Sequence, residues 1–205
     1  NIKKNIFSGC FFKMRGGGYK NFNKYLNGIK ILYDVINEEM PNFSLRLFID
    51  MSIYNDKTIM NILYKLKKIE IVLFCCNLYK RENIYHLGTF GTILRAFPLF
   101  DFPNNDSNRV IIVDIDILEN NKYNILEGYK NLLKYYTDDE LDKLYIFGSG
   151  KPYMVLNNKK YIIDNKDIKP YIIIGKIIGF KKIPKKIIIN FLYNVEKNKK
   201  IYSTY

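Results

Sequence analysis

The sequence predicts an α/β fold of three layers: a mostly parallel central β-sheet flanked by helices, with a small antiparallel addition in the C-terminal third. Two patterns predict it. Strand-like and helix-like segments alternate as far as residue 136, which is typical of a parallel sheet covered on both faces. Beyond that point short strand-like segments dominate, which favours local antiparallel pairing. For a chain of 205 residues without an obvious linker, we expect a single domain, 1–205.

The first part of the chain contains three expected strands with helices between them. The first strand is expected at 4–13 and the second at 44–50. The helix between them ends before Pro41 and is marked by apolar residues at helical spacing: Phe22, Tyr25, Leu26, Ile29, Leu32, Tyr33 and Ile36. A helix at 56–68 then leads into a third strand at 69–76.

The remaining elements follow in the same alternating order at first. Residues 86–100 predict a helix whose start is loosened by glycines, and the buried strand Val110–Val113 comes next. A further helix is expected over 125–136. The C-terminal third predicts a last helix near 184–196, preceded by short strands within three segments: 143–150, 153–164 and 171–180.

Composition and charge limit the class of protein. Hydrophobic residues make up 48% of the chain and aromatic residues 16%, which excludes a disordered polypeptide. The net charge of +13 fits two interpretations, a solvated lysine surface or a general attraction for anionic ligands. The longest apolar run, 171–180, is shorter than the roughly 18 residues of a membrane span and contains a lysine.

The N-terminus and the cysteines indicate a compartment. The apolar patch near the N-terminus is shorter than that of a secretion signal. Cys10, Cys75 and Cys76 form neither a disulfide framework nor a zinc-binding spacing, which favours a reducing environment. We therefore expect a cytoplasmic protein without a membrane span.

Two aspartates directly follow the buried strand Val110–Val113. In open α/β sheets ligands bind beyond the carboxyl ends of the strands, and residues two apart in extended chain point to the same side. Asp114 and Asp116 would repel each other there unless a positive group joins them. Mg²⁺ and Mn²⁺ take carboxylate oxygens together with phosphate oxygens. The spacing alone fits either a seat for a metal–diphosphate complex or a solvated strand end with incidental aspartates.

The residues before this pair carry a family resemblance. The stretch "HLGTFGTILRAFPLFDFPNNDSNRVIIVDIDIL", 86–118, resembles the central region of GT-A glycosyltransferases, in which an arginine-bearing helix and an apolar strand lead into an Asp-x-Asp motif. More narrowly, it resembles the small GT-A domains encoded by large DNA viruses. The segments "SLRLFID" and "IEIVLFCC" are similar to the second and third strands of that family. The resemblance covers most of 4–120 and thins after residue 140.

The resemblance implies roles for individual residues. Asp114 and Asp116 match the metal motif, in which the second aspartate binds Mn²⁺ or Mg²⁺ and the first reaches the metal or the ribose. Arg95 matches the helix arginine that approaches the donor sugar or its diphosphate. Three further implied donor-binding residues lie at the first strand, where the base and ribose of the nucleotide would lie: Ser8, Gly9 and Cys10. The last, Asp50, ends the second strand near the same rim.

Residues at the start of the arginine-bearing helix fit two interpretations each. His86, the only histidine, is either a donor contact or a structural, exposed side chain. Gly88 and Gly91 either allow close approach of a sugar or phosphate to the backbone or provide simple loop flexibility. We include His86 and Gly91 among the candidate donor-binding residues.

The expected function is that of a metal-dependent glycosyltransferase, in which Asp114, Asp116 and Arg95 are the catalytic group. The resemblance implies a nucleotide-sugar donor, most specifically a UDP-sugar, bound by 1–120, and a glycan or glycoprotein acceptor bound by 121–205. The cytoplasm would be that of a host cell if the protein is viral. We do not expect nucleic acid as a partner.

Two alternative functions stay open. "VIIVDIDIL" also resembles the first motif of haloacid-dehalogenase-type phosphatases, in which the two aspartates act as nucleophile and acid/base. That motif usually opens its fold, whereas here more than 100 residues precede it. The other alternative is a basic nucleic-acid-binding domain, which the net charge of +13 permits.

Overall fold

The computed structural model describes a large part of the chain. The described residues are 3–13, 22–74, 88–100, 103–104, 106–117, 145–146, 153–156, 159–162, 177–178 and 184–197. The helix expected over 125–136 lies outside these residues. Among the described helices, none has both the length and the apolar character needed to cross a membrane.

A sheet at the centre of the molecule confirms the α/β class. Within the described residues its strand order is β3-β2-β1-β4-β8. The first four strands in chain order are parallel to one another: β1 (Lys4–Phe11), β2 (Phe43–Ile49), β3 (Ile69–Leu73) and β4 (Ser107–Ile112). Each falls within or close to the segment expected from the apolar pattern. The short strand β8 (Ile177–Ile178) pairs with β4 in the antiparallel direction.

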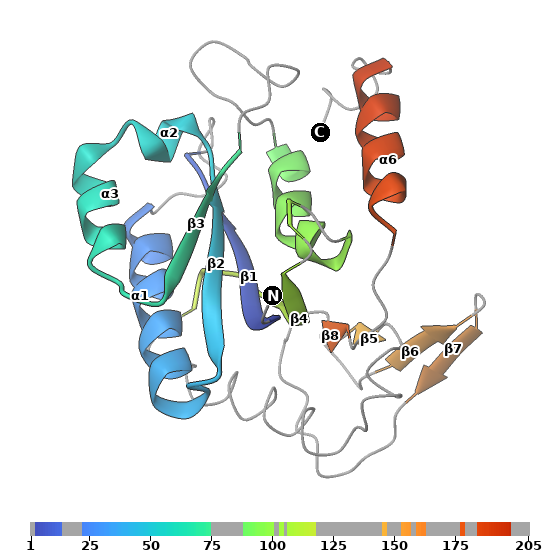
Figure 1. Ribbon diagram of the computed structural model, residues 1–205, viewed down its shortest axis with the longest axis horizontal. Helices are drawn as coiled ribbons and strands as arrows, with labels where there is room; N and C mark the ends of the chain where they lie inside the picture. Colours follow the sequence, from blue (N-terminus) through green and yellow to red (C-terminus); the bar gives the residue numbers. More distant parts are fainter. Residues whose placement is uncertain are drawn as a thin grey trace.

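A second, smaller sheet lies in the C-terminal third of the chain. Its strands are β5 (Tyr145–Ile146), β6 (Tyr153–Leu156) and β7 (Lys159–Ile162), in that order, and both of its pairings are antiparallel. Figure 1 shows these strands beyond β4 and β8, away from β3.

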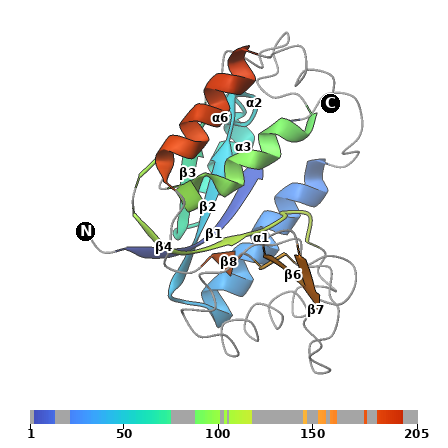
Figure 2. The same cartoon turned by 90° about the vertical axis from the view of Figure 1, so that its right-hand side faces the viewer.

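Helices cover both faces of the central sheet (Figures 1 and 2). One face is covered by α1 (Phe22–Glu39) and α3 (Lys57–Tyr64), and the other by the 3₁₀ helix η2 (Gly88–Phe100) and α6 (Lys185–Lys197). The single-turn helix α2 (Met51–Tyr54), which the sequence analysis did not predict, separates β2 from α3. The helix expected at 86–100 is confirmed over its described part.

The apolar core is divided between these two faces. On the α1 face, buried residues of the sheet such as Phe7 and Ile111 pack with the helix residues Ile29 and Leu63. On the η2 face, Ile6 packs against Leu99, and Phe48 packs against Phe97 and Ile188 in neighbouring clusters. Successive strand residues alternate between the two cores, as the pleat of a buried parallel strand requires.

The order of the strands defines a switch point in the sheet. The chain runs outward from β1 to β2 and β3 and then crosses to the other side of β1 to form β4. The order in which strands are added to the sheet therefore reverses between β1 and β4. In doubly wound sheets of this kind, ligands bind in the crevice beyond the carboxyl ends of the strands at this point. The residues that follow β1 and β4 are therefore the first place to search for a functional site.

Candidate functional site

Asp114 and Asp116 lie at the carboxyl end of β4, at the switch point. The backbone of β4 remains bonded to β1 as far as Val113, whose N–H donates to the carbonyl of Ser8 at 3.0 Å. Beyond Val113 the chain leaves the sheet. The carboxylate-bearing side chains are 41% exposed at Asp114 and 43% exposed at Asp116, so both can be reached by a ligand.

Arg95 joins η2 to the end of β4. Its Nη1 donates to the carbonyl oxygen of Val113 at 3.2 Å and forms an ion pair with Oδ1 of Asp114. The Arg95 side chain is only 17% exposed, so the guanidinium is held close to the protein surface rather than extended into solvent. The structure thus brings together Arg95 and Asp114, which are 19 residues apart in sequence.

Asp116 pairs with a different element. Lys24, near the start of α1, donates from Nζ to Oδ2 of Asp116 at 3.2 Å. Because α1 and η2 cover opposite faces of the sheet, the two aspartates contact cations from opposite sides. β4 ends at Ile112 and the chain bends at Ile115, so the expectation that the two carboxylates share a side, which assumed an extended backbone, stays a prediction.

Ile115, between the two aspartates, anchors the segment to the protein. Its side chain is 6% exposed and belongs to the core under α1. Glycines on two elements make room for this segment: Gly28 for its backbone and Gly9 for the Ile115 side chain. A Cβ at Gly28 would lie far inside van der Waals contact with the carbonyl oxygen of Ile115 and 2.9 Å from the nitrogen of Ile117. A Cβ at Gly9 would lie 2.9 Å from Cγ2 of Ile115.

The three candidate residues of β1 occupy different environments. Ser8 and Gly9 are buried within the sheet, and the Ser8 hydroxyl is a buried group for which the described residues provide no hydrogen-bond partner. Cys10 lies nearer the carboxyl end of β1. Burial raises the pKa of the Cys10 thiol to about 12, against a smaller lowering effect of Arg95. The thiol is therefore protonated at neutral pH and is a poor nucleophile.

Asp50 directly follows β2 and is the N-cap residue of α2. It is fully buried, and its Oδ1 accepts hydrogen bonds from the backbone N–H of Ser52 at 3.0 Å and from the Ser52 hydroxyl. Burial raises the pKa of the Asp50 carboxyl above its ordinary value, although these hydrogen bonds oppose the shift. These contacts cap α2. A role of Asp50 in donor binding stays a prediction.

The two candidates from the start of the arginine-bearing segment are placed differently. Gly91 lies within η2, four residues before Arg95. His86 lies outside the described residues, so its predicted donor contact is untested.

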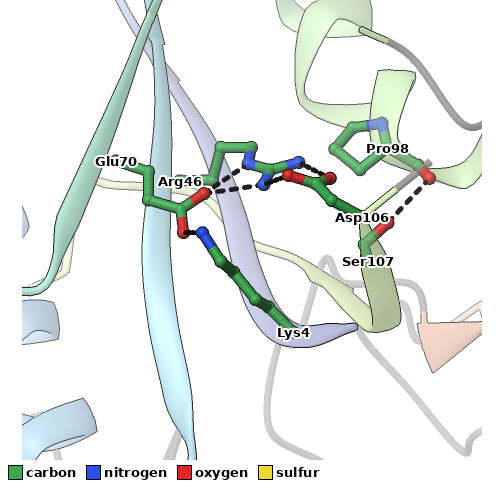
Figure 3. A network of polar contacts seen from close by, with 6 residues as sticks. All are labelled: Lys4, Arg46, Glu70, Pro98, Asp106 and Ser107. Atoms are coloured by element: carbon green, nitrogen blue, oxygen red, sulfur yellow. Dashed lines mark hydrogen bonds and ion pairs between the residues drawn. The ribbon is translucent and has the colours of Figure 1, made fainter. Parts of the chain in front are cut away.

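A network of charged side chains lies at the opposite, amino-terminal end of the sheet (Figure 3). Arg46, on β2 and only 3% exposed, donates from Nε and Nη2 to Glu70 at 2.9 and 2.6 Å. Its Nη1 and Nη2 also donate to the two carboxylate oxygens of Asp106 at 3.0 and 2.7 Å. Lys4 completes the network with a 2.6 Å hydrogen bond to Glu70.

The acidic groups of this network stay ionised to lower pH than usual. Burial by itself would raise the pKa of Glu70, but hydrogen bonds from Lys4 and Arg46 hold it below its ordinary value. Burial by itself would also raise the pKa of Asp106, but the Arg46 guanidinium lowers it below its ordinary value. Burial would lower the pKa of Arg46, whereas its bonds to Asp106 and Glu70 raise it. The network therefore consists of paired charges.

The donor atoms at Asp114 and Asp116 suit a hard divalent cation only in part. Carboxylate oxygens are the ligands that Mg²⁺ and Mn²⁺ prefer. Over the part of the chain that the structure describes, however, no cluster of three or more His, Cys, Asp or Glu residues could hold a metal ion. Two carboxylates leave most of a six-coordinate shell to water and to a ligand. The residues present therefore fit a cation that is bound together with phosphate oxygens.

Comparison with known proteins assigns no family. The sequence matches no protein-family model and no curated protein. Among solved structures, it is similar to a 4-diphosphocytidyl-2C-methyl-D-erythritol synthase from Anaerococcus prevotii, at 17% identity and a TM-score of 0.40. That match covers 98% of this chain and 77% of the other.

Lys24, Gly28 and Arg46 are not among the residues predicted from the sequence. The sequence contains a signal for two of these residues, Gly28 and Arg46. An isolated glycine inside a strongly amphipathic helix indicates a packing reason, which Gly28 has. A charged residue in the middle of the apolar strand "SLRLFID" requires buried partners, which Arg46 has. No comparable signal marks Lys24, because its partner lies 92 residues away.

Proposed function

We propose that this protein is a metal-dependent glycosyltransferase that takes a sugar from a nucleotide-sugar donor, most specifically a UDP-sugar. The acceptor in this proposal is a hydroxyl group of a glycan or glycoprotein. One observation carries the proposal: Asp114 and Asp116 lie half-exposed at the carboxyl end of β4, at the switch point, with Arg95 beside them. The resemblance of residues 86–118 to GT-A glycosyltransferases supports the same interpretation.

The chemistry of sugar transfer matches these residues. The reaction breaks the bond between the sugar and a nucleoside diphosphate, on which negative charge develops. A divalent cation, when bound, stabilises that charge. Asp114 and Asp116 would hold the cation by their carboxylate oxygens, and Arg95 would add its positive charge on the η2 side. Such fixed charges need little reorganisation as the leaving group forms.

The position of Arg95 suits it to this task. Its guanidinium is already oriented by the carbonyl of Val113 and by Asp114. It therefore does not lose side-chain freedom when a ligand arrives. In the proposed reaction Arg95 is an orienting and charge-stabilising group. The residues that bind the acceptor would come from 121–205, most of which lie outside the described residues.

A thermal-shift and donor-hydrolysis screen tests the proposal. UDP-, GDP- and dTDP-sugars are each compared with and without Mn²⁺. We expect one nucleotide class, that of UDP, to raise the melting temperature only when Mn²⁺ is present. Asp116→Asn should abolish this response, whereas Asp34→Asn, which changes an exposed aspartate on α1, should retain it. A wild-type protein whose melting temperature no nucleotide changes would refute the proposal.

The same preparations separate the alternatives. A phosphatase of the haloacid-dehalogenase type would hydrolyse p-nitrophenyl phosphate, and the proposed glycosyltransferase would not. A basic nucleic-acid binder would retain salt-sensitive binding to DNA or RNA after loss of both aspartates. Either result, together with the absence of a nucleotide response, would replace the proposed function.

A further inference from the structure

The ion pair between Lys24 and Asp116 connects α1 to the candidate site. It joins the start of one helix to a residue 92 positions later, at a distance of 3.2 Å. Both side chains are partly exposed, 38% at Lys24 and 43% at Asp116. The pair therefore lies at the mouth of the site rather than in the core. At the mouth, a ligand or a metal ion can compete for either partner.

The backbone on both sides of this pair is held in a fixed relation. Gly28, one helical turn after Lys24, lies directly against the carbonyl of Ile115. Ile115 itself is buried against the α1 core. Because the helix and the aspartate segment touch at Gly28, neither can move away without breaking this contact. Lys24 therefore stays within reach of Asp116 and of any ligand that Asp116 binds.

A lysine in this place affects the two parts of a metal–phosphate complex in opposite directions. Its ammonium group repels a divalent cation that approaches the same carboxylate. It also attracts the negatively charged oxygens of a phosphate. A lysine side chain is long and flexible, so its ammonium can exchange one partner for another without movement of the helix.

We propose that Lys24 is the resident counter-cation of Asp116, and that it leaves Asp116 when a divalent cation binds there and then pairs with the anionic oxygens of a phosphate-bearing ligand. This inference rests on the proposed function, because it assumes a cation and a phosphate at Asp116. It adds a ligand-binding residue from α1, on the side of the site opposite to Arg95 and η2.

Binding of Mn²⁺ alone tests the first half of the inference. Free Mn²⁺ is measured by electron paramagnetic resonance in titrations of the wild type, Lys24→Met, Lys24→Arg and Lys30→Met. Lys24→Met should bind Mn²⁺ more tightly, by about two- to fivefold, as expected for loss of a partly exposed charge. Lys24→Arg keeps the charge, and Lys30→Met removes an exposed lysine elsewhere on α1, so both should match the wild type.

Binding of UDP in the presence of saturating Mn²⁺ tests the second half. Here Lys24→Met should bind more weakly than the wild type by a similar factor, and Lys24→Arg should restore the affinity. A purely structural role of Lys24 would weaken both Mn²⁺ and UDP binding. Thermal melting without ligand verifies that each variant is folded, and Lys24→Gln serves as the uncharged variant if Lys24→Met does not fold.

The outcomes separate the two proposals. If the wild type binds neither Mn²⁺ nor UDP, the proposed function is refuted, and the role of Lys24 is refuted with it. If the wild type binds both and Lys24→Met binds Mn²⁺ with unchanged or reduced affinity, only the role of Lys24 is refuted. Opposite changes in the two affinities support it.

Discussion

Arg46 is one of two charged residues buried in the described part of the chain, the other being Asp50. It is a cation within a buried strand, and it is acceptable there because two carboxylates from different parts of the chain bond to it. Glu70 and Asp106 are each about one quarter exposed, so they link the buried guanidinium to the surface. Removal of the cation would leave two like charges close together without their partner.

Arg46→Met should therefore destabilise the protein strongly. The expected loss is about 3 kcal/mol or more in the free energy of unfolding, which is the usual cost of removing one partner of a buried ion pair. Urea denaturation measures this loss. Lys65→Met, which changes an exposed lysine after α3, is the control and should remain within about 0.5 kcal/mol of the wild type. A loss for Arg46→Met no larger than that of the control would show that the network contributes little.

The same network predicts how stability depends on pH. The pKa values of Glu70 and Asp106 are lower in the folded protein than the ordinary values of 4.5 and 3.8. Because the folded state holds these protons less tightly than the unfolded state, the stabilisation is complete above the ordinary values. It is lost as the pH falls through the lowered, folded-state values.

Glu70→Gln should reduce this dependence on pH. Urea denaturation of the wild type between about pH 6 and pH 3 should show a fall in the free energy of unfolding, and the fall should be smaller in the variant. Glu38→Gln, at an exposed position on α1, should retain the wild-type dependence. Equal dependence on pH in the wild type and Glu70→Gln would contradict the lowered pKa of Glu70.

At the scale of elements, α1 both covers the sheet and positions the segment that carries Asp114 and Asp116. Its apolar face packs into the larger core, and Gly28 on that face touches the backbone of Ile115 and Ile117. In a helix, glycine is less favourable than alanine by about 1 kcal/mol. The close backbone contact therefore explains why glycine stands at this position.

Gly28→Ala should destabilise the protein although it improves helix propensity. The added Cβ cannot fit beside the Ile115 carbonyl, so we expect a loss of about 2 kcal/mol or more in the free energy of unfolding, as for other overpacked positions. Asn27→Ala, at the neighbouring exposed position, is the matched control and should be neutral or stabilising. If Gly28→Ala were stabilising as well, the contact between α1 and the aspartate segment would not exist.

Most elements could be predicted from local patterns. Long apolar periodicity predicts α1, and the apolar runs predict β1 to β4, because burial of one face or both faces requires those residue types. The helix α2 could not be predicted in this way, since four residues are too few to show a period. Its signal is instead a capping pair, Asp50 with the N–H of Ser52, which resembles an ordinary turn in sequence.

At the scale of the whole molecule, the position of the candidate site could be predicted but its internal contacts could not. The Asp-x-Asp motif after an apolar strand indicates the carboxyl edge of a sheet, and Asp114 and Asp116 lie there. Which cation reaches each aspartate depends on how the helices dock on the two faces. That docking brings Lys24 to Asp116 over 92 residues, and no local pattern contains it.

Acidic groups lie at both ends of the central sheet, so the two ends can be compared as sites for a divalent cation. Asp114 and Asp116 lie at the carboxyl ends of the strands, and Glu70 and Asp106 lie at the amino ends. The second pair shares the buried Arg46 and is about one quarter exposed, whereas the side chains of Asp114 and Asp116 are 41% and 43% exposed. A divalent cation with a nucleotide should therefore select the first pair.

Paramagnetic broadening of backbone amide signals by Mn²⁺ tests this selection most directly. With UDP present and Mn²⁺ below one equivalent, the amide signals of Phe12, Asp114 and Asp116 should disappear first from the nuclear magnetic resonance spectrum. The signals of Lys4, Glu70 and Asp106 should persist. Preferential broadening at the amino-terminal end, or equal broadening at both ends, would contradict a metal–nucleotide site at the carboxyl ends of β1 and β4.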